Sequence, residues 1–262
     1  MKIQKILNLL MVFIVLIFAA CEPIVDEESL KNTTDVDGVE LVATQSTPGG
    51  NGITLEMVTP GVTGYWDYNI GRAYSDKAAF TYPIPGNNTF TFIGTLGAEF
   101  FTKTIEVQVD QLDQPLDQDW YDLVSDDTSA GKTWVFDKSG PYWYMCAPND
   151  INAWEGVWWD AGPCCINDGN GDGSMTFNLD GAANYIRVAT TGAAPQTASF
   201  ALDVPNQKLA FTGELNILGD DPSRSNPAGV YEIIRLTETE LILYLPLTPA
   251  GDSAWVWKFI AQ

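Results

Sequence analysis

The chain has 262 residues, of which 45% are hydrophobic and 18% charged, a composition typical of folded globular protein. Its formal net charge of −21 repels nucleic acid and anionic lipid headgroups, so both are excluded as partners. The sequence contains no histidine, which excludes Ser-His and Cys-His nucleophile pairs and imidazole ligands for zinc.

The first twenty residues are typical of a signal peptide. Lys2 and Lys5 precede an apolar run, and the small pair Ala19-Ala20 stands directly before Cys21. This ending resembles a bacterial lipobox, which implies that Cys21 is lipidated and that the chain is held on the outer membrane, facing the cell exterior. An ordinary secreted protein or a single transmembrane anchor are the alternatives, but the run of about fifteen apolar residues is short for a span of about twenty.

Residues 21–38 comprise the expected lipidated N-terminus, Cys21, and an acidic tether. The tether is expected because these residues are polar and show no periodicity. The cluster Asp26-Glu27-Glu28 resembles the surface-export signal of Bacteroidetes lipoproteins.

Residues 39–112 are predicted to form a small β-domain, since β-rich segments alternate there with Gly, Pro and Asn turns. Strands are expected at residues 39–45, 53–59, 78–82, 89–95 and 102–110.

The same region resembles a PKD domain, an immunoglobulin-like sandwich. The residues that carry the resemblance are Trp66-Asp67-Tyr68, Gly71, Ser75, Gly86 and the closing Thr104-Ile105-x-Val107. Relative to the family pattern, Asn69-Ile70 lengthens the turn after the tryptophan. The resemblance implies a spacer module, and Trp66 is expected in the core between the sheets.

Residues 113–130 are a predicted acidic linker with a short helical turn at 120–124, and residues 131–262 are a second, larger β-domain. Nine strands are expected there, at residues 133–137, 142–146, 174–179, 185–190, 198–204, 208–215, 231–237, 240–247 and 254–260. Their spacing predicts an all-β sandwich or jelly roll, with a barrel as the alternative. The segments 231–237 and 241–244 resemble late strands of bacterial lipocalin-like domains, which implies the barrel. Trp255, Trp257 and Phe259 alternate and are expected to share a core face.

Residues 134–172 hold five of the nine tryptophans, and from Ala147 onward these are interleaved with turn formers, which favours a ligand-binding loop. A flat aromatic ring covers the apolar face of a sugar, while carboxylate and amide oxygens accept from its hydroxyls. Each such platform contributes only about 1 kcal/mol, so several are needed. The predicted platforms are Tyr142, Trp143, Tyr144, Trp154, Trp158 and Trp159, with Asp150, Asn152, Glu155 and Asp160 as polar partners.

Neighbouring side chains of a strand point to opposite faces. One ring of the Trp158-Trp159 pair is therefore expected in the core and the other outside.

Three cysteines remain after Cys21, and an exported protein meets an oxidising compartment. A disulfide is expected between Cys146 and either Cys164 or Cys165, with a bond between the two neighbours as the alternative. Closing such a loop contributes roughly 3 kcal/mol.

Asp168, Asn170 and Asp172 begin a D-x-N-x-D-G pattern, which supplies the hard oxygens that Ca²⁺ prefers. The twelfth position is Leu179 instead of Glu, so an EF-hand is excluded. A one-sided calcium site at these residues and a plain turn are the two expectations.

The order of anchor, tether, PKD-like spacer and aromatic-rich domain resembles the SusE/SusF-like group of Bacteroidetes surface glycan-binding lipoproteins. The resemblance implies a non-catalytic protein that captures an oligo- or polysaccharide and passes it to an outer-membrane importer. Two alternatives stay open: a glycoside hydrolase with a carboxylate pair such as Glu155 and Asp160, and a lipocalin-like or structural surface protein.

Overall fold

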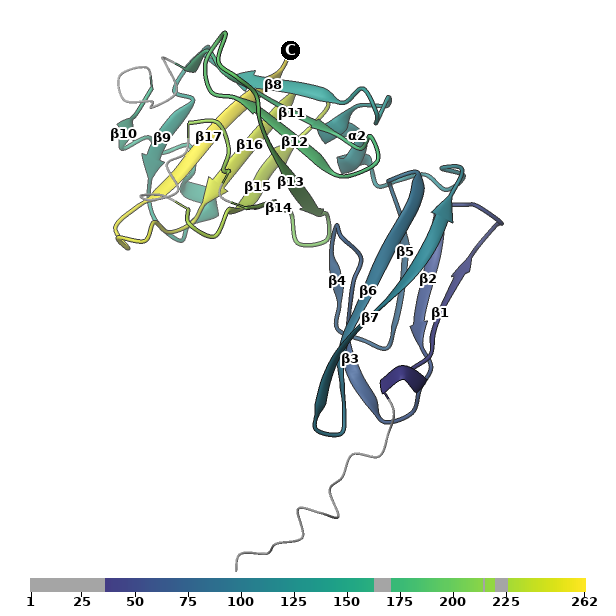
Figure 1. Ribbon diagram of the computed structural model, residues 1–262. Helices are drawn as coiled ribbons and strands as arrows, with labels where there is room; N and C mark the ends of the chain where they lie inside the picture. The colour runs from purple at the N-terminus through teal and green to yellow at the C-terminus, as the bar shows by residue number, and fades with distance from the viewer. Residues whose placement is uncertain (1–35, 163–170, 214, 220–225) are drawn as a thin grey trace, which may run out of the picture.

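The computed structural model describes residues 36–162, 171–213, 215–219 and 226–262. Within these ranges the chain is all-β, as predicted, with a sandwich followed by a barrel (Figure 1). In this described part, no helix is long and apolar enough to cross a membrane.

The sandwich consists of two antiparallel sheets. One sheet has the order β1 (Leu41–Gln45), β2 (Gly52–Met57), β5 (Lys77–Thr81), and the other β4 (Arg72–Ala73), β3 (Val62–Asp67), β6 (Gly86–Leu96), β7 (Glu99–Val109). Trp66 is fully buried between them, meets the ring of Phe92 edge-on at 5.2 Å, and donates its indole N–H to the carbonyl of Asp76. The predicted core position of Trp66 is therefore confirmed.

Strands β3 and β4 are not among the strands predicted from the sequence. Gly64 interrupts the alternation of β3 and lies opposite Gly94, where an added Cβ would lie 2.4 Å from the carbonyl oxygen of Ile93. The turn between β3 and β4 has Asn69 at φ 71°, a left-handed conformation that Asn tolerates. The Asn69-Ile70 pair thus lengthens the turn without ending the sheet.

Helix α2 (Gln118–Val124), predicted as a helical turn, packs against the barrel. Trp120 lies 6.1 Å from Phe200 between ring centroids, and the indole N–H of Trp134 donates to the carbonyl of Leu123 at 3.0 Å. Lys132 donates to the carbonyls of Tyr121 and Asp122 in the last turn of α2. The helix dipole also favours a cation at this end of the helix. The linker is thereby fastened to the second domain.

The barrel has eight strands: β8 (Lys132–Phe136), β11 (Ser174–Asn178), β12 (Asn184–Val188), β13 (Gln196–Asp203), β14 (Lys208–Thr212), β15 (Val230–Leu236), β16 (Glu240–Leu245) and β17 (Ala254–Ala261). Strands β11 to β17 pair in chain order, and β8 pairs with both β11 and β17. This double pairing closes the sheet, so the arrangement found for this region is the barrel that was the alternative to a two-sheet sandwich.

Large side chains fill the barrel interior. The fully buried ones that share the main core are Trp134, Phe177, Tyr185, Phe200, Tyr231, Trp257 and Phe259. The predicted core face of β17 is confirmed for Trp257 and Phe259, while Trp255 is partly buried against the same core.

Candidate functional site

The candidate site lies on a two-stranded extension of the barrel sheet. Strand β9 (Trp143–Cys146) pairs with the first half of β17, whereas β8 pairs with the second half, so β9 lies outside the closed ring. Strand β10 (Trp159–Asp160) pairs with β9 and forms the edge of the sheet (Figure 1).

Three predicted platforms on and before β9 are buried, namely Tyr142, Trp143 and Tyr144. The ring of Trp143 packs 5.2 Å from that of Trp255, and Tyr142 packs 4.9 Å from Phe136. No ring face is left for a ligand to stack on, so the prediction of a platform is wrong for these three residues. The aromatic pattern predicted exposed rings here, but both faces of β9 are covered: Trp143 packs in the main core and Tyr144 in a second apolar cluster.

Trp154 lies on the outer face of the barrel. It packs on a second apolar cluster, which contains Tyr144, Cys146, Ile242, Tyr244, Ala254 and Val256. The guanidinium of Arg235 and the ammonium of Lys258 lie 5.7 and 5.9 Å from its ring centroid. The protein's own cations and apolar side chains meet this ring, so Trp154 holds its segment against the barrel. The structure does not support the prediction that Trp154 is a platform for a ligand.

Trp158 and Trp159 are both exposed, with 59% and 44% of their surface accessible. The prediction that one of them is in the core is wrong, because both lie at the edge of the sheet outside the closed barrel, where the described residues bury neither ring. The backbone is nevertheless fixed: Trp158 donates its N–H to the carbonyl of Met145, and Ala161 donates to that of Trp143.

The ring of Trp159 is supported by Trp255, which it meets edge-on at 5.9 Å with an interplanar angle of 81°. Trp255 in turn packs on Trp143 and Trp257. The sequence analysis did not identify Trp255 as part of the site. The alternation of β17 predicted Trp255 to lie in the core. Its place beside Trp159 depends on strand pairing, because Met145 of β9 pairs with Trp255 on one side and with Trp159 on the other.

The four predicted polar partners Asp150, Asn152, Glu155 and Asp160 are all exposed. Asp150 accepts the N–H of Asn152 and begins the 3-10 helix η3 (Ile151–Ala153), and Asp160 accepts the N–H of Gly162. The carboxylates of Asp150 and Asp160 are therefore each oriented by a backbone donor. Exposed rings beside oriented acceptors are the chemical elements of a carbohydrate site.

Cys146 is a buried free thiol, so the predicted disulfide is not formed in this structure; Cys164 and Cys165, like Cys21, lie outside the described residues. Burial raises the pKa of the Cys146 thiol to about 11, and the charge of Asp150 adds to the shift. A thiol with so high a pKa is protonated at neutral pH and is a poor nucleophile.

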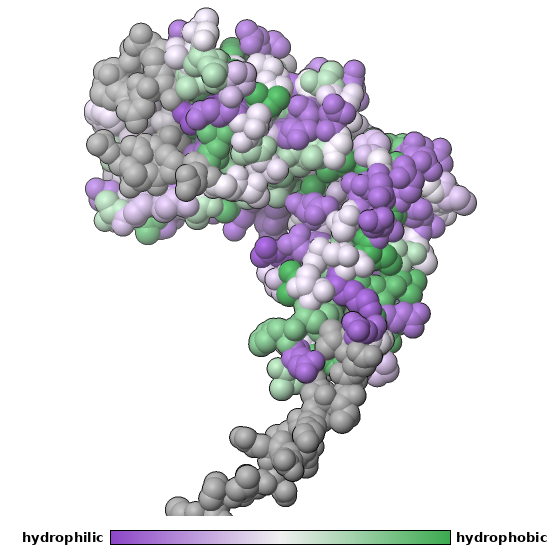
Figure 2. All heavy atoms as spheres, in the orientation of Figure 1, coloured by the Kyte–Doolittle hydropathy of each residue, from purple (hydrophilic) through white to green (hydrophobic). Residues whose placement is uncertain are grey.

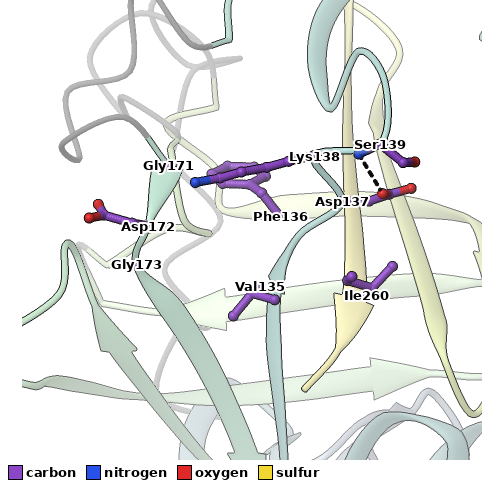
Figure 3. Close-up of a pocket in the computed structure, with 9 residues that line it drawn as sticks. All are labelled: Val135, Phe136, Asp137, Lys138, Ser139, Gly171, Asp172, Gly173 and Ile260. Atoms are coloured by element: carbon purple, nitrogen blue, oxygen red, sulfur yellow. Dashed lines mark hydrogen bonds between the residues drawn. The ribbon is translucent and has the colours of Figure 1, made fainter.

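Of the predicted calcium ligands, Asp168 and Asn170 also lie outside the described residues. Asp172 accepts from the hydroxyl of Thr190 at 2.9 Å and lines an open cleft of about 460 Å³ with Asp137 and Lys138 (Figure 3). The hydrogen bond from Ser139 lowers the pKa of Asp137, and the charge of Lys258 contributes. The described residues contain no group of three or more His, Cys, Asp or Glu arranged to hold a metal ion.

Neither the protein-family models nor the curated proteins contain a match to this chain. The case for function therefore depends on the site itself.

Proposed function

We propose that this chain is a non-catalytic surface lipoprotein that binds an oligo- or polysaccharide through Trp158 and Trp159. The observation that carries the proposal is the pair of adjacent, exposed indole rings on an edge strand whose backbone is hydrogen-bonded to the barrel. Exposed tryptophan is uncommon on a protein surface unless it meets a partner. The absence of histidine and the buried, protonated Cys146 agree with a role without catalysis.

The geometry favours a ligand long enough to contact two rings at the edge of the sheet. Trp158 directly precedes β10 and Trp159 is its first residue, so the two exposed rings are carried by consecutive residues. One stacked sugar face hides about 50 Å², which contributes about 1 kcal/mol per ring. A chain of several sugars that contacts both rings gains more than a single sugar can, which supports a polymeric ligand.

The rest of the chain supports capture at a distance from the cell. Lipidation at Cys21, the acidic tether and the immunoglobulin-like sandwich would carry the barrel outward, and an outer-membrane importer would receive the glycan. The sandwich is then a spacer: Trp66, Phe90 and Phe92 are buried in its core, and its exposed aromatic residues, Tyr74 and Phe100, belong to a different domain from Trp158 and Trp159.

The test is affinity gel electrophoresis of residues 22–262 in a panel of polysaccharides, with Trp158→Ala and Trp159→Ala beside the parent chain. Retardation by at least one glycan, reduced in both variants while their thermal unfolding stays cooperative, is the expected result. Absence of retardation in the whole panel would refute glycan capture, and release of reducing ends would show a hydrolase instead.

A second candidate, binding of a small molecule with a hydrogen-bond acceptor beside β9 and β17, is favoured by one observation. The indole N–H groups of Trp143 and Trp257 are buried and have no hydrogen-bond partner among the described residues, although the two residues face each other across β9 and β17. A buried donor without an acceptor costs roughly 1–3 kcal/mol. Mass spectrometry of an organic extract of the purified protein would reveal a bound ligand that carries an acceptor.

A further inference from the structure

The turn between β6 and β7 presents the most exposed large hydrophobic side chain of the described residues. Phe100 is 87% accessible and is the second residue after the Gly97-Ala98 turn, opposite Thr95. Its neighbour Phe101 points into the sandwich core and is buried. Phe100 therefore contributes nothing evident to packing, and it indicates an external partner only if further exposed apolar side chains lie beside it.

A second apolar side chain lies at the same end of the sandwich. Val62 pairs with Leu96, so the connection between β2 and β3 lies beside the β6–β7 turn. That connection carries Val58, which is 41% accessible, and the exposed Pro60. Three apolar side chains are thus displayed at one end of the domain.

The described chain begins at this same end. Lys103 of β7, three residues from Phe100, donates to the carbonyls of Asp37 and Val39, which fixes the entry of the chain beside the turn. Figure 1 shows the 3-10 helix η2 (Val36–Gly38) beside the lower ends of β6 and β7, with the barrel joined to the opposite end. Figure 2 shows green, apolar residues on this lower part of the sandwich.

We propose that this end of the sandwich, with Phe100 at its turn, contacts the lipid surface to which the chain is tethered. The inference depends on the expected N-terminal anchor and not on glycan capture. Fifteen peptide units separate Cys21 from Val36, a reach of about 50 Å, so the anchor alone leaves the sandwich free to move over the membrane. A membrane attachment becomes stable when a second contact adds to the lipid, and an aromatic ring suits the interface.

The charges around the β6–β7 turn indicate the headgroup charge of the lipid that it contacts. Asp37, Glu40 and Glu99 are exposed near it, and the whole chain has a net charge of −21. These carboxylates oppose an anionic surface, so the partner is a zwitterionic lipid face. With the turn at the lipid, Trp158 and Trp159 are carried by the domain farther from the membrane.

The test replaces the natural anchor with a defined one. The chain from residue 21 onward, with Cys21→Ser and an N-terminal hexahistidine, is attached to phosphatidylcholine vesicles through a nickel-chelating lipid; the chain has no other histidine. Hydrogen exchange of residues 96–102 is measured on the vesicles and after release with imidazole. Exchange in this segment is expected to slow roughly tenfold on the vesicles, which corresponds to about 1.4 kcal/mol.

Two matched variants decide the outcome. Phe100→Ser is expected to abolish the slowing, while Tyr74→Ser, which changes a 78% accessible aromatic at the opposite edge of the same sheet, is expected to keep it. Both sites are exposed, so both variants are expected to melt like the parent. Exchange that is unaffected by tethering, or slowed equally in Phe100→Ser, would overturn the proposal.

Discussion

Trp159 rests edge-on against Trp255, with ring centroids 5.9 Å apart, while Trp158 beside it meets no aromatic ring of the described residues. The two exposed tryptophans are thus held differently among the described residues: Trp255 supports the ring of Trp159, whereas Trp158 is fixed by the hydrogen bond of its backbone to Met145. This difference leads to the first prediction.

Replacing Trp255 with Leu is expected to weaken glycan binding several-fold, although Trp255 is not proposed to touch the ligand. Leu removes the ring that fixes Trp159, so the ligand must order that platform on binding. Trp255→Phe restores a ring and is expected to recover most of the affinity. Affinity electrophoresis measures both, and equal affinity of Trp255→Leu and the parent chain would show that Trp159 needs no support.

Trp154→Ala is expected to destabilise the chain by about 2–3 kcal/mol, because the ring covers an apolar cluster and meets two cations. Trp158→Ala, which removes an exposed ring, is the control and is expected to change the free energy of unfolding by less than about 0.5 kcal/mol. Urea unfolding of the two variants distinguishes the roles. If both lost the same stability, Trp154 would not be the residue that holds the outer segment.

The stability of the chain is expected to fall between pH 9 and pH 11, in part through Cys146. Its pKa is raised by burial from an ordinary value of 9.0 to about 11, so below pH 9 the thiol is protonated in both states and has no effect. Above pH 9 the unfolded chain loses the proton first, which increasingly favours unfolding until the folded thiol also ionises.

Burial also raises the pKa of Tyr144 and Tyr244, so these side chains add to the alkaline loss. Cys146→Ala keeps both tyrosines and isolates the thiol. Urea unfolding at pH 8 and pH 10.5 is expected to show a smaller loss in this variant than in the parent chain. Equal losses would assign the whole effect to other groups.

Gly162→Ala is expected to cost about 1–3 kcal/mol, since a Cβ there would lie 2.5 Å from the ring of the buried Tyr142. The substitution would push β10 away from β9 and lower glycan affinity too. Gly140→Ala is the matched control, because a Cβ at that position meets nothing within 4 Å. Thermal unfolding compares the two, and an unchanged melting temperature for Gly162→Ala would mean that the ring moves aside freely.

The calcium site remains a prediction. If Asp168, Asn170 and Asp172 bind Ca²⁺ with a Kd of about 10⁻⁴–10⁻³ M, then 10 mM calcium stabilises the fold by roughly 1.4–2.7 kcal/mol. Calorimetry with calcium and then with a chelator measures this shift, which Asp172→Asn is expected to reduce and Asp180→Asn to leave intact. If calcium does not change the melting temperature of the parent chain, these residues form a plain turn and not a calcium site.

Periodicity predicted the strands well because most of them alternate between more buried and more exposed side chains. All nine predicted strands of the second domain are present, and the hairpin of β15 and β16 turns near Glu238 as expected. Strands β3, β4 and β10 were missed, since Gly64 breaks the pattern of the first and the other two have only two residues each. Closure into a barrel was not determined by the pattern, because it depends on β8 pairing with two partners far apart in the chain.

The candidate site was predicted less well than the fold. Aromatic residues in a turn-rich segment drew attention to Trp158 and Trp159, which are exposed, but composition does not distinguish them from Trp143 or Trp154, which are not. The distinction depends on which strand lies at the edge, and therefore on long-range pairing. For the same reason the sequence offered no signal for the support that Trp255 gives to Trp159.

The position of β10 also affects how copies of this chain meet one another. A closed ring hides the backbone donors and acceptors of its strands, and the outer side of β10 remains available for strand addition. That side spans only two residues, one of them Asp160, in a chain of strong negative charge. So short an acidic edge is a poor template for sheet growth between molecules, although it lies beside two exposed rings.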